Sequence, residues 1–114
     1  MTINDNIQKL IQESKQIFIT KNSKISGKGN FATTNITKNT NFGLAFTKIG
    51  NTGNPDKDYT RTELGKYTNH SDNPNLEILK KDNKYYFVSN QSIKSNTELT
   101  VNYQLFDWEG ERDF

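Results

Sequence analysis

Cysteine is absent from this sequence of 114 residues, and histidine occurs once. Without cysteine, the chain can form no disulfide, carry no catalytic thiol and bind no zinc through thiolates. A single histidine would leave any metal site dependent on carboxylates, so we expect no metal site.

Long apolar stretches are also missing. Hydrophobic residues make up 31% of the chain, and no apolar run approaches the roughly 20 residues that cross a bilayer. The N-terminus lacks the charged and apolar pattern of a secretory signal. We therefore expect a cytoplasmic protein with no membrane partner. The frequent Asn and Lys residues hint at a virus or an AT-rich bacterium as the source.

Charge of one sign is not concentrated anywhere along the sequence. The formal net charge is +2, and its lysines are dispersed except for Lys80, Lys81 and Lys84. This cluster is weaker than the basic stripe that is typical of a nucleic-acid-binding protein. We therefore expect no nucleic-acid partner.

The length predicts a single domain over residues 1–114. Seven Phe, five Tyr and one Trp supply large side chains for one core. Apolar residues at three-to-four spacing between residues 3 and 11 predict one short helix near the N-terminus. The alternating segments predict strands. They lie at residues 16–20, around Phe31, and at 42–46, 76–80, 84–89 and 98–103.

The connecting segments complete a mostly β (α+β) fold. Gly, Pro, Asn and Asp residues over 50–58 predict an exposed loop, and residues 62–67 predict one helical turn. A core this small also leaves a homodimer open, because association would bury more apolar surface.

Three short motifs are each weak evidence alone. In "SGKGNFA", Gly27 and Gly29 are most simply a tight turn, and the dinucleotide and P-loop patterns both fail. In "NHSDNPN", residues 69–75, the Asn and Asp residues suit a tight loop, and a triad of adjacent residues is rejected because their side chains point apart. In "ELTVNY", Tyr103 on its own is most simply a half-buried core residue.

Taken together and in this order, the motifs resemble those of the SET-domain protein lysine methyltransferases. The family's stretches look like GxGxFA, NHSCxPN and GEELTxDY, and here they read "GKGNFA", "NHSDNPN" and "NTELTVNY". The resemblance covers residues 16–103 as a core, with 1–15 as a helical extension and 104–114 as a tail. The short chain resembles the minimal virus-encoded members, which lack zinc-binding flanks, and Asp72 departs from the family's cysteine.

The resemblance implies several roles. The cofactor would be S-adenosylmethionine, and Tyr103 would be the catalytic tyrosine. The C-terminal segment would cross the loop of residues 69–75 in a pseudoknot-like arrangement. Asn69 would contact the methionine moiety and the main chain of His70 the adenine. The other expected cofactor contacts are Gly27, Lys28, Gly29 and Trp108.

The channel for the target lysine is expected to be lined by Tyr67, Val101 and Phe106. Many family members carry an aromatic residue at the position of Val101, and that residue tunes how many methyl groups the channel accepts. Valine there predicts di- or trimethyllysine as the product.

The resulting hypothesis is an enzyme that transfers methyl groups to lysine ε-amines of a protein. Histone-like proteins and ribosomal or translation proteins are both open as substrates. Two alternatives remain: a catalytically inactive SET-like module that binds a protein or S-adenosylmethionine, and an architectural β-domain whose motif matches are accidental. Labelled methyl transfer and calorimetry separate the three.

Overall fold

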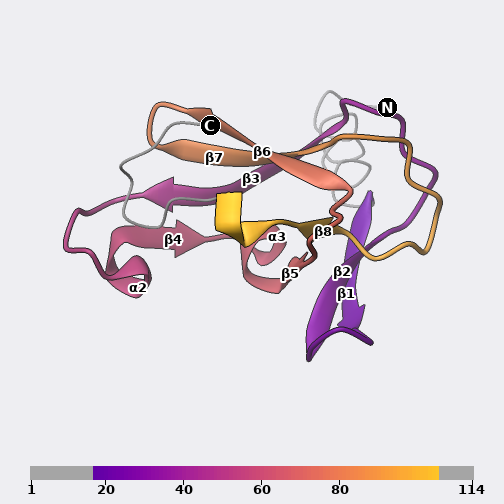
Figure 1. The fold of residues 1–114 in the computed structure, drawn as a ribbon, viewed down its shortest axis with the longest axis horizontal. Coiled ribbons are helices and arrows are strands. Elements are labelled where there is room, and N and C mark those ends of the chain that lie inside the picture. Colours follow the sequence, from indigo (N-terminus) through magenta and orange to yellow (C-terminus); the bar gives the residue numbers. More distant parts are fainter. Residues whose placement is uncertain (1–16, 106–114) are drawn as a thin grey trace, which may run out of the picture.

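The computed structural model describes residues 17–105, and strands dominate them (Figure 1). In chain order the strands are β1 (Phe18–Asn22), β2 (Lys28–Ala32), β3 (Asn41–Lys48), β4 (Tyr59–Arg61), β5 (Asn69–His70), β6 (Leu76–Lys81), β7 (Lys84–Ser89) and β8 (Thr100–Val101). The helical segments are α2 (Pro55–Asp58), α3 (Glu63–Tyr67) and the 3-10 helix η1 (Tyr103–Leu105). The mostly β fold predicted from the sequence is confirmed.

A four-stranded antiparallel sheet in the order β4-β3-β7-β6 carries most of the core. Its apolar residues alternate on β7, where Tyr85 and Phe87 are buried. On β3 the register shifts between Leu44 and Phe46. This bulge lets the consecutive residues Ala45 and Phe46 both be buried. Phe46 and Phe87 then meet edge to face, with their ring centroids 5.8 Å apart.

Strands β1 and β2 form an antiparallel hairpin beside this sheet (Figure 1). The turn of the hairpin is closed by the N–H of Ser23, which donates to the carbonyl of Gly27 at 2.8 Å. Gly27 has a φ of 47°, a left-handed conformation that favours glycine. The other edge of β2 binds residues 97–99, because the N–H of Leu99 donates to the carbonyl of Asn30 at 2.7 Å.

The first residues of the NHS motif pair with the middle of the ELT motif. β5 and β8 are parallel, and Asn69 lies opposite Thr100. Asn75 strengthens this crossing, since its side chain donates to the carbonyl of Glu98 at 2.9 Å and accepts from the N–H of Thr100 at 2.8 Å. Residues 98–101 therefore lie between β2 and the loop of residues 69–75, which brings all three motifs together.

Several local predictions need correction. The expected loop at 50–58 contains the helix α2, because Asn54 caps it and Pro55 begins it. The expected strand 98–103 is shorter: β8 ends at Val101, and Tyr103 begins η1. The predicted helical turn at 62–67 is confirmed as α3. The predicted helix within residues 1–15 lies outside the described residues.

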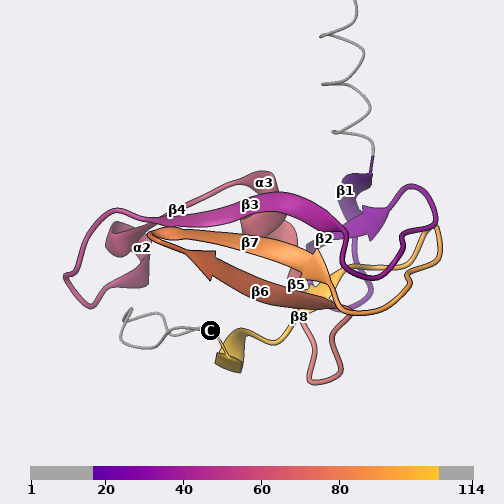
Figure 2. The same cartoon turned by 90° about the horizontal axis from the view of Figure 1, so that it is seen from above.

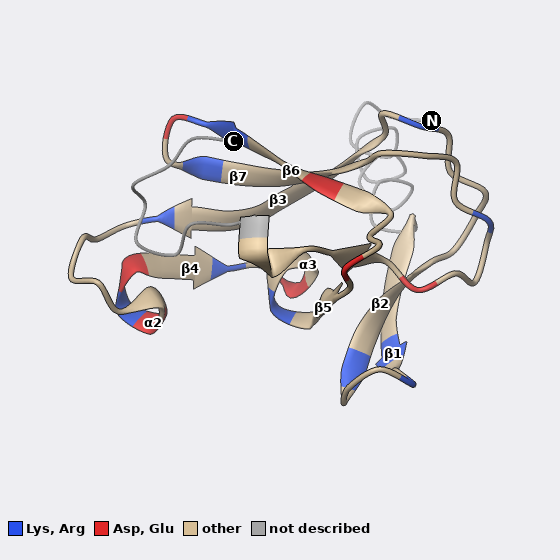
Figure 3. Ribbon diagram, in the orientation of Figure 1, with Lys and Arg blue, Asp and Glu red and all other residues tan. Residues whose placement is uncertain are grey.

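Figure 2 shows the sheet from above, with α3 on the side of β3 and η1 beyond β8. Basic and acidic residues are interspersed along the described chain (Figure 3). Within residues 17–105, no helix has the length and apolar character that crossing a membrane requires.

Candidate active site

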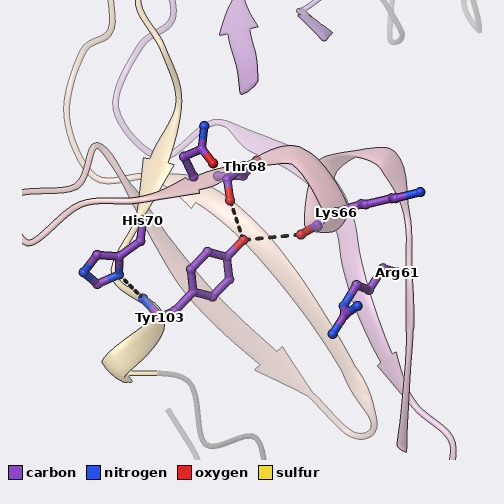
Figure 4. Close-up of a pocket in the computed structure, with 7 residues that line it drawn as sticks. Arg61, Lys66, Thr68, His70 and Tyr103 are labelled. Carbon is purple, nitrogen blue, oxygen red and sulfur yellow. Dashed lines mark hydrogen bonds between the residues drawn. The ribbon is translucent and has the colours of Figure 1, made fainter. Parts of the chain in front are cut away.

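Tyr103 lies in a cavity of about 310 Å³ that the NHS motif and α3 help to form (Figure 4). The cavity is lined by Arg61, Gly65, Lys66, Thr68, Asn69, His70 and Tyr103. These residues come from β4, α3, β5 and η1, with Thr68 just before β5. Three residues predicted for the site from the sequence, Asn69, His70 and Tyr103, are thus brought together in one cavity.

The hydroxyl of Tyr103 is anchored by main-chain oxygens. It donates to the carbonyl of Thr68 at 2.7 Å, and the carbonyl of Gly65 lies 3.3 Å away. Burial raises the pKa of Tyr103 far above its usual range, although the charge of Arg61 opposes this. The phenol therefore stays neutral at physiological pH, and three oxygen atoms converge at one point of the cavity wall.

Two contacts fix the position of α3, which carries the Gly65 carbonyl near the Tyr103 hydroxyl. A Cβ at Gly65 would collide with the carbonyl of Ala45 on β3, so glycine permits the close packing of α3 on the sheet. The buried side chain of Asn30 donates to the hydroxyl of Thr68 at 3.0 Å and to the carbonyl of Leu64 at 3.2 Å. Its oxygen accepts from the hydroxyl of Thr20 at 2.6 Å. Asn30 thus ties the hairpin to the first turn of α3 and to Thr68.

His70 orients the start of η1 with its side chain. Its Nδ1 accepts from the N–H of Tyr103 at 3.1 Å, and its Nε2 lies 2.9 Å from a carboxylate oxygen of Asp72. Because Nδ1 is an acceptor, these contacts fit the neutral imidazole whose hydrogen is on Nε2. The imidazole and phenol rings stack with their centroids 6.4 Å apart. The side chain of His70 therefore positions Tyr103, a role that the sequence did not indicate.

The glycine motif contacts Asn69. Lys28 lies on β2, and its carbonyl accepts from the Asn69 side chain at 3.2 Å. At Gly27 a side chain would meet nothing within 4 Å, whereas at Gly29 it would meet the carboxylate of Glu98. The two glycines therefore serve different ends: Gly27 permits the turn conformation, and Gly29 leaves space for an acidic side chain.

Of the residues expected to line the lysine channel, Tyr67 and Val101 are described, and neither lines this cavity. Tyr67 is half-buried on α3, with the Nζ atom of Lys66 5.2 Å from its ring centroid. Val101 is 1% exposed and belongs to the wall of a second cavity of about 260 Å³. That cavity is lined by Pro74, Leu76, Glu77, Ile78, Asn90, Val101 and Asn102.

Phe106 and Trp108 lie outside the described residues, so their predicted roles stay predictions. Within residues 17–105, no three His, Asp or Glu side chains gather closely enough to hold a metal ion. The sequence did not single out the site residues Asn30, Thr68 and Glu98. Of these, Asn30 and Glu98 lie inside the quoted motifs, and that location was the sequence feature that could have identified them.

Comparisons with known proteins agree with this fold. The sequence model of the SET domain matches residues 9–104. A search of curated proteins gave no match. Among solved structures, a candidate histone methyltransferase of Plasmodium falciparum is similar, with 22% identity and a TM-score of 0.62. The similarity covers 75% of this chain and 96% of that one. The chain belongs to the SET domain family, whose members are generally protein lysine methyltransferases.

Proposed function

We propose that this protein transfers methyl groups from S-adenosylmethionine to the ε-amine of lysine in a protein substrate. The observation that carries the proposal is the position of Tyr103. Its neutral, half-buried hydroxyl lies with the carbonyls of Thr68 and Gly65 in one cavity wall. Asn69 and His70 of the NHS motif line the same cavity.

The residues present fit such a ligand. When bound, S-adenosylmethionine supplies a methyl group attached to a positively charged sulfur. The Tyr103 hydroxyl and the carbonyls of Thr68 and Gly65 can accept weak C–H···O contacts, each of which contributes about 0.5–1 kcal/mol. They are held in place by the fold, so they need not reorganise during the reaction. Asn69 offers an amide oxygen that accepts from no donor among residues 17–105.

Tyr103 cannot serve as the base for this reaction. Its raised pKa leaves almost none of the phenolate form at neutral pH, so there is no phenolate to accept the proton. The attacking lysine must nevertheless be neutral, and a free lysine of pKa about 10.4 costs roughly 4–5 kcal/mol to deprotonate at pH 7. We assign Tyr103 the task of aligning the amine and the methyl group, which is how a narrow site accelerates a displacement.

The substrate and the product belong to the same proposal. The substrate is a protein lysine, in a histone-like protein or in a ribosomal or translation protein. The product is di- or trimethyllysine, because Val101 supplies no bulky aromatic ring at the position where many family members carry one. Intact-mass analysis of a lysine peptide under excess cofactor tests the product, and a reaction that stops at one methyl group would contradict it.

The activity itself is tested with radiolabelled S-adenosylmethionine and a lysate of candidate substrates, followed by mass spectrometry of the labelled proteins. We expect label on lysine. Binding without transfer to any protein would indicate an inactive SET-like module. Absence of binding by calorimetry would overturn the cofactor assignment as well.

A further inference from the structure

We infer that Glu98 is a positioning residue for the cofactor site and that it acts by fixing the amide of Asn69. The inference rests on the proposed function, in which Asn69 binds S-adenosylmethionine. Glu98 precedes β8 and lies opposite Phe31 of β2 in an antiparallel bridge. Its side chain joins three segments that are far apart in the sequence: the β1–β2 turn, the NHS motif and the ELT motif.

The carboxylate of Glu98 first fixes the β1–β2 turn. Both of its oxygens lie 2.8 Å from the Oγ of Ser23. A hydroxyl has one hydrogen, so Ser23 donates it to the carboxylate and accepts from other groups. One such group is the N–H of Ile25, which donates to the Ser23 Oγ at 2.9 Å. The turn that supplies the main chain around Gly27 is therefore held against Glu98.

The same carboxylate determines which way the Asn69 amide faces. The Nδ2 of Asn69 has four oxygens within reach: Ser23 Oγ at 3.1 Å, Ser26 O at 3.1 Å, Lys28 O at 3.2 Å and Glu98 Oε2 at 2.8 Å. The Glu98 contact is the shortest and the only one to a charged acceptor. A rotated amide would turn the Oδ1 of Asn69 toward these lone pairs. The contacts therefore keep Nδ2 facing the turn and Oδ1 facing away from it. Oδ1 can then accept a hydrogen bond from the ligand.

Gly29 leaves the space in which the Glu98 carboxylate lies. A Cβ at Gly29 would collide with the carboxylate of Glu98 and lie 3.0 Å from the Cβ of Ser23. Gly29 does not have a positive φ, so glycine is favoured there by the space that Glu98 occupies and not by the backbone conformation. The second glycine of the GxG motif thus makes room for a protein carboxylate, which in turn orients Asn69.

Removal of the carboxylate should weaken cofactor binding chiefly through Asn69. In Glu98→Ala the amide of Asn69 loses its charged acceptor and can rotate away from the geometry that presents Oδ1. In Glu98→Gln one amide oxygen can still accept from Asn69, so a smaller effect is expected. The matched control is Asp82→Asn, which removes a carboxylate at the β6–β7 turn, where asparagine tolerates the φ of 56°.

The experiment is calorimetric titration of each variant with S-adenosylmethionine, at a temperature well below its own melting transition. We expect Glu98→Ala to raise Kd about tenfold or more, which corresponds to about 1.4 kcal/mol. Glu98→Gln should be intermediate and Asp82→Asn unchanged. Gly29→Ala should resemble Glu98→Ala, because its new Cβ displaces the carboxylate.

A double-mutant cycle separates positioning from a general structural effect. If Glu98 acts through Asn69, Glu98→Ala should change Kd little in an Asn69→Ala background. A full, additive effect there would overturn the inference, as would an unchanged Kd in Glu98→Ala when the wild-type protein binds. Failure of the wild-type protein to bind would instead overturn the proposed function, and this inference with it.

Discussion

Replacement of Tyr103 by phenylalanine tests the proposed catalytic role most directly. The change removes one hydroxyl, which donates to the carbonyl of Thr68 at 2.7 Å. The net contribution of such a bond to stability is about 1 kcal/mol. In a domain of this size, that loss lowers the melting temperature by roughly 4–8 °C. Tyr103→Phe should therefore be a folded protein with a modest stability cost.

The expected loss of activity is larger than this stability cost can explain. One C–H···O contact contributes about 0.5–1 kcal/mol, which alone would slow the reaction about two- to fivefold. Loss of the hydrogen bond also frees the carbonyls of Thr68 and Gly65 to shift, and small misplacements of aligned groups cost up to about a hundredfold. We expect kcat to fall roughly tenfold to a hundredfold in Tyr103→Phe.

The assay is methyl transfer to a peptide at 25 °C, with cofactor Kd and melting temperature measured in parallel. Kd should stay within about twofold of the wild type. The matched control is Tyr86→Phe, which removes a phenolic hydroxyl from a half-buried tyrosine on β7. Retention of full activity in Tyr103→Phe, together with a lower melting temperature, would reduce Tyr103 to a core residue and refute the reasoning.

Three further predictions concern pH and stability. Turnover should rise from pH 7 toward pH 9 as the lysine amine becomes neutral. Ionisation of Tyr103 should cause no decline in this range, because its pKa is raised. A bell-shaped pH–rate profile centred near pH 6.5 would instead point to imidazole chemistry. Asn30→Ala should cost about 2 kcal/mol or more in urea unfolding, since it leaves several buried partners unpaired. The backbone N–H of Thr52 lowers the pKa of Asp58, which is 2% exposed, so Asp58 stabilises the fold above about pH 4. Thermal melts should show that Asp58→Asn destabilises at pH 7 and that this difference shrinks as the pH falls below 4.

The sequence predicted the parts of the molecule that depend on local pattern. Strands such as β6 and β7 follow from alternating apolar residues, and the helical turn predicted at 62–67 is α3. The order of the three motifs indicated the family. Asn69, His70 and Tyr103 then proved to share one cavity, which no local pattern could show.

What the sequence could not predict are contacts between distant residues. Asn30 bonds to Thr68 across 38 positions, and Glu98 bonds to Ser23 across 75. The glycine pair illustrates the difficulty: both residues looked alike in "GKG", yet the left-handed backbone favours glycine at Gly27, while the carboxylate of Glu98 occupies the space beside Gly29. The reason for a glycine can lie in a neighbour that only the fold supplies.

The parallel pair β5–β8 explains why the site and the fold depend on each other. Two residue pairs alone cannot hold a two-stranded sheet in water. Side-chain hydrogen bonds strengthen this pairing. The side chain of Asn75 bonds to the carbonyl of Glu98 and to the N–H of Thr100, and the side chain of His70 accepts from the N–H of Tyr103. The groups that keep the C-terminal segment in place are thus the ones that set the position of the Tyr103 hydroxyl. A chain without cysteine can in this way fix the position of a phenol by hydrogen bonds to side-chain amides, an imidazole and main-chain carbonyls.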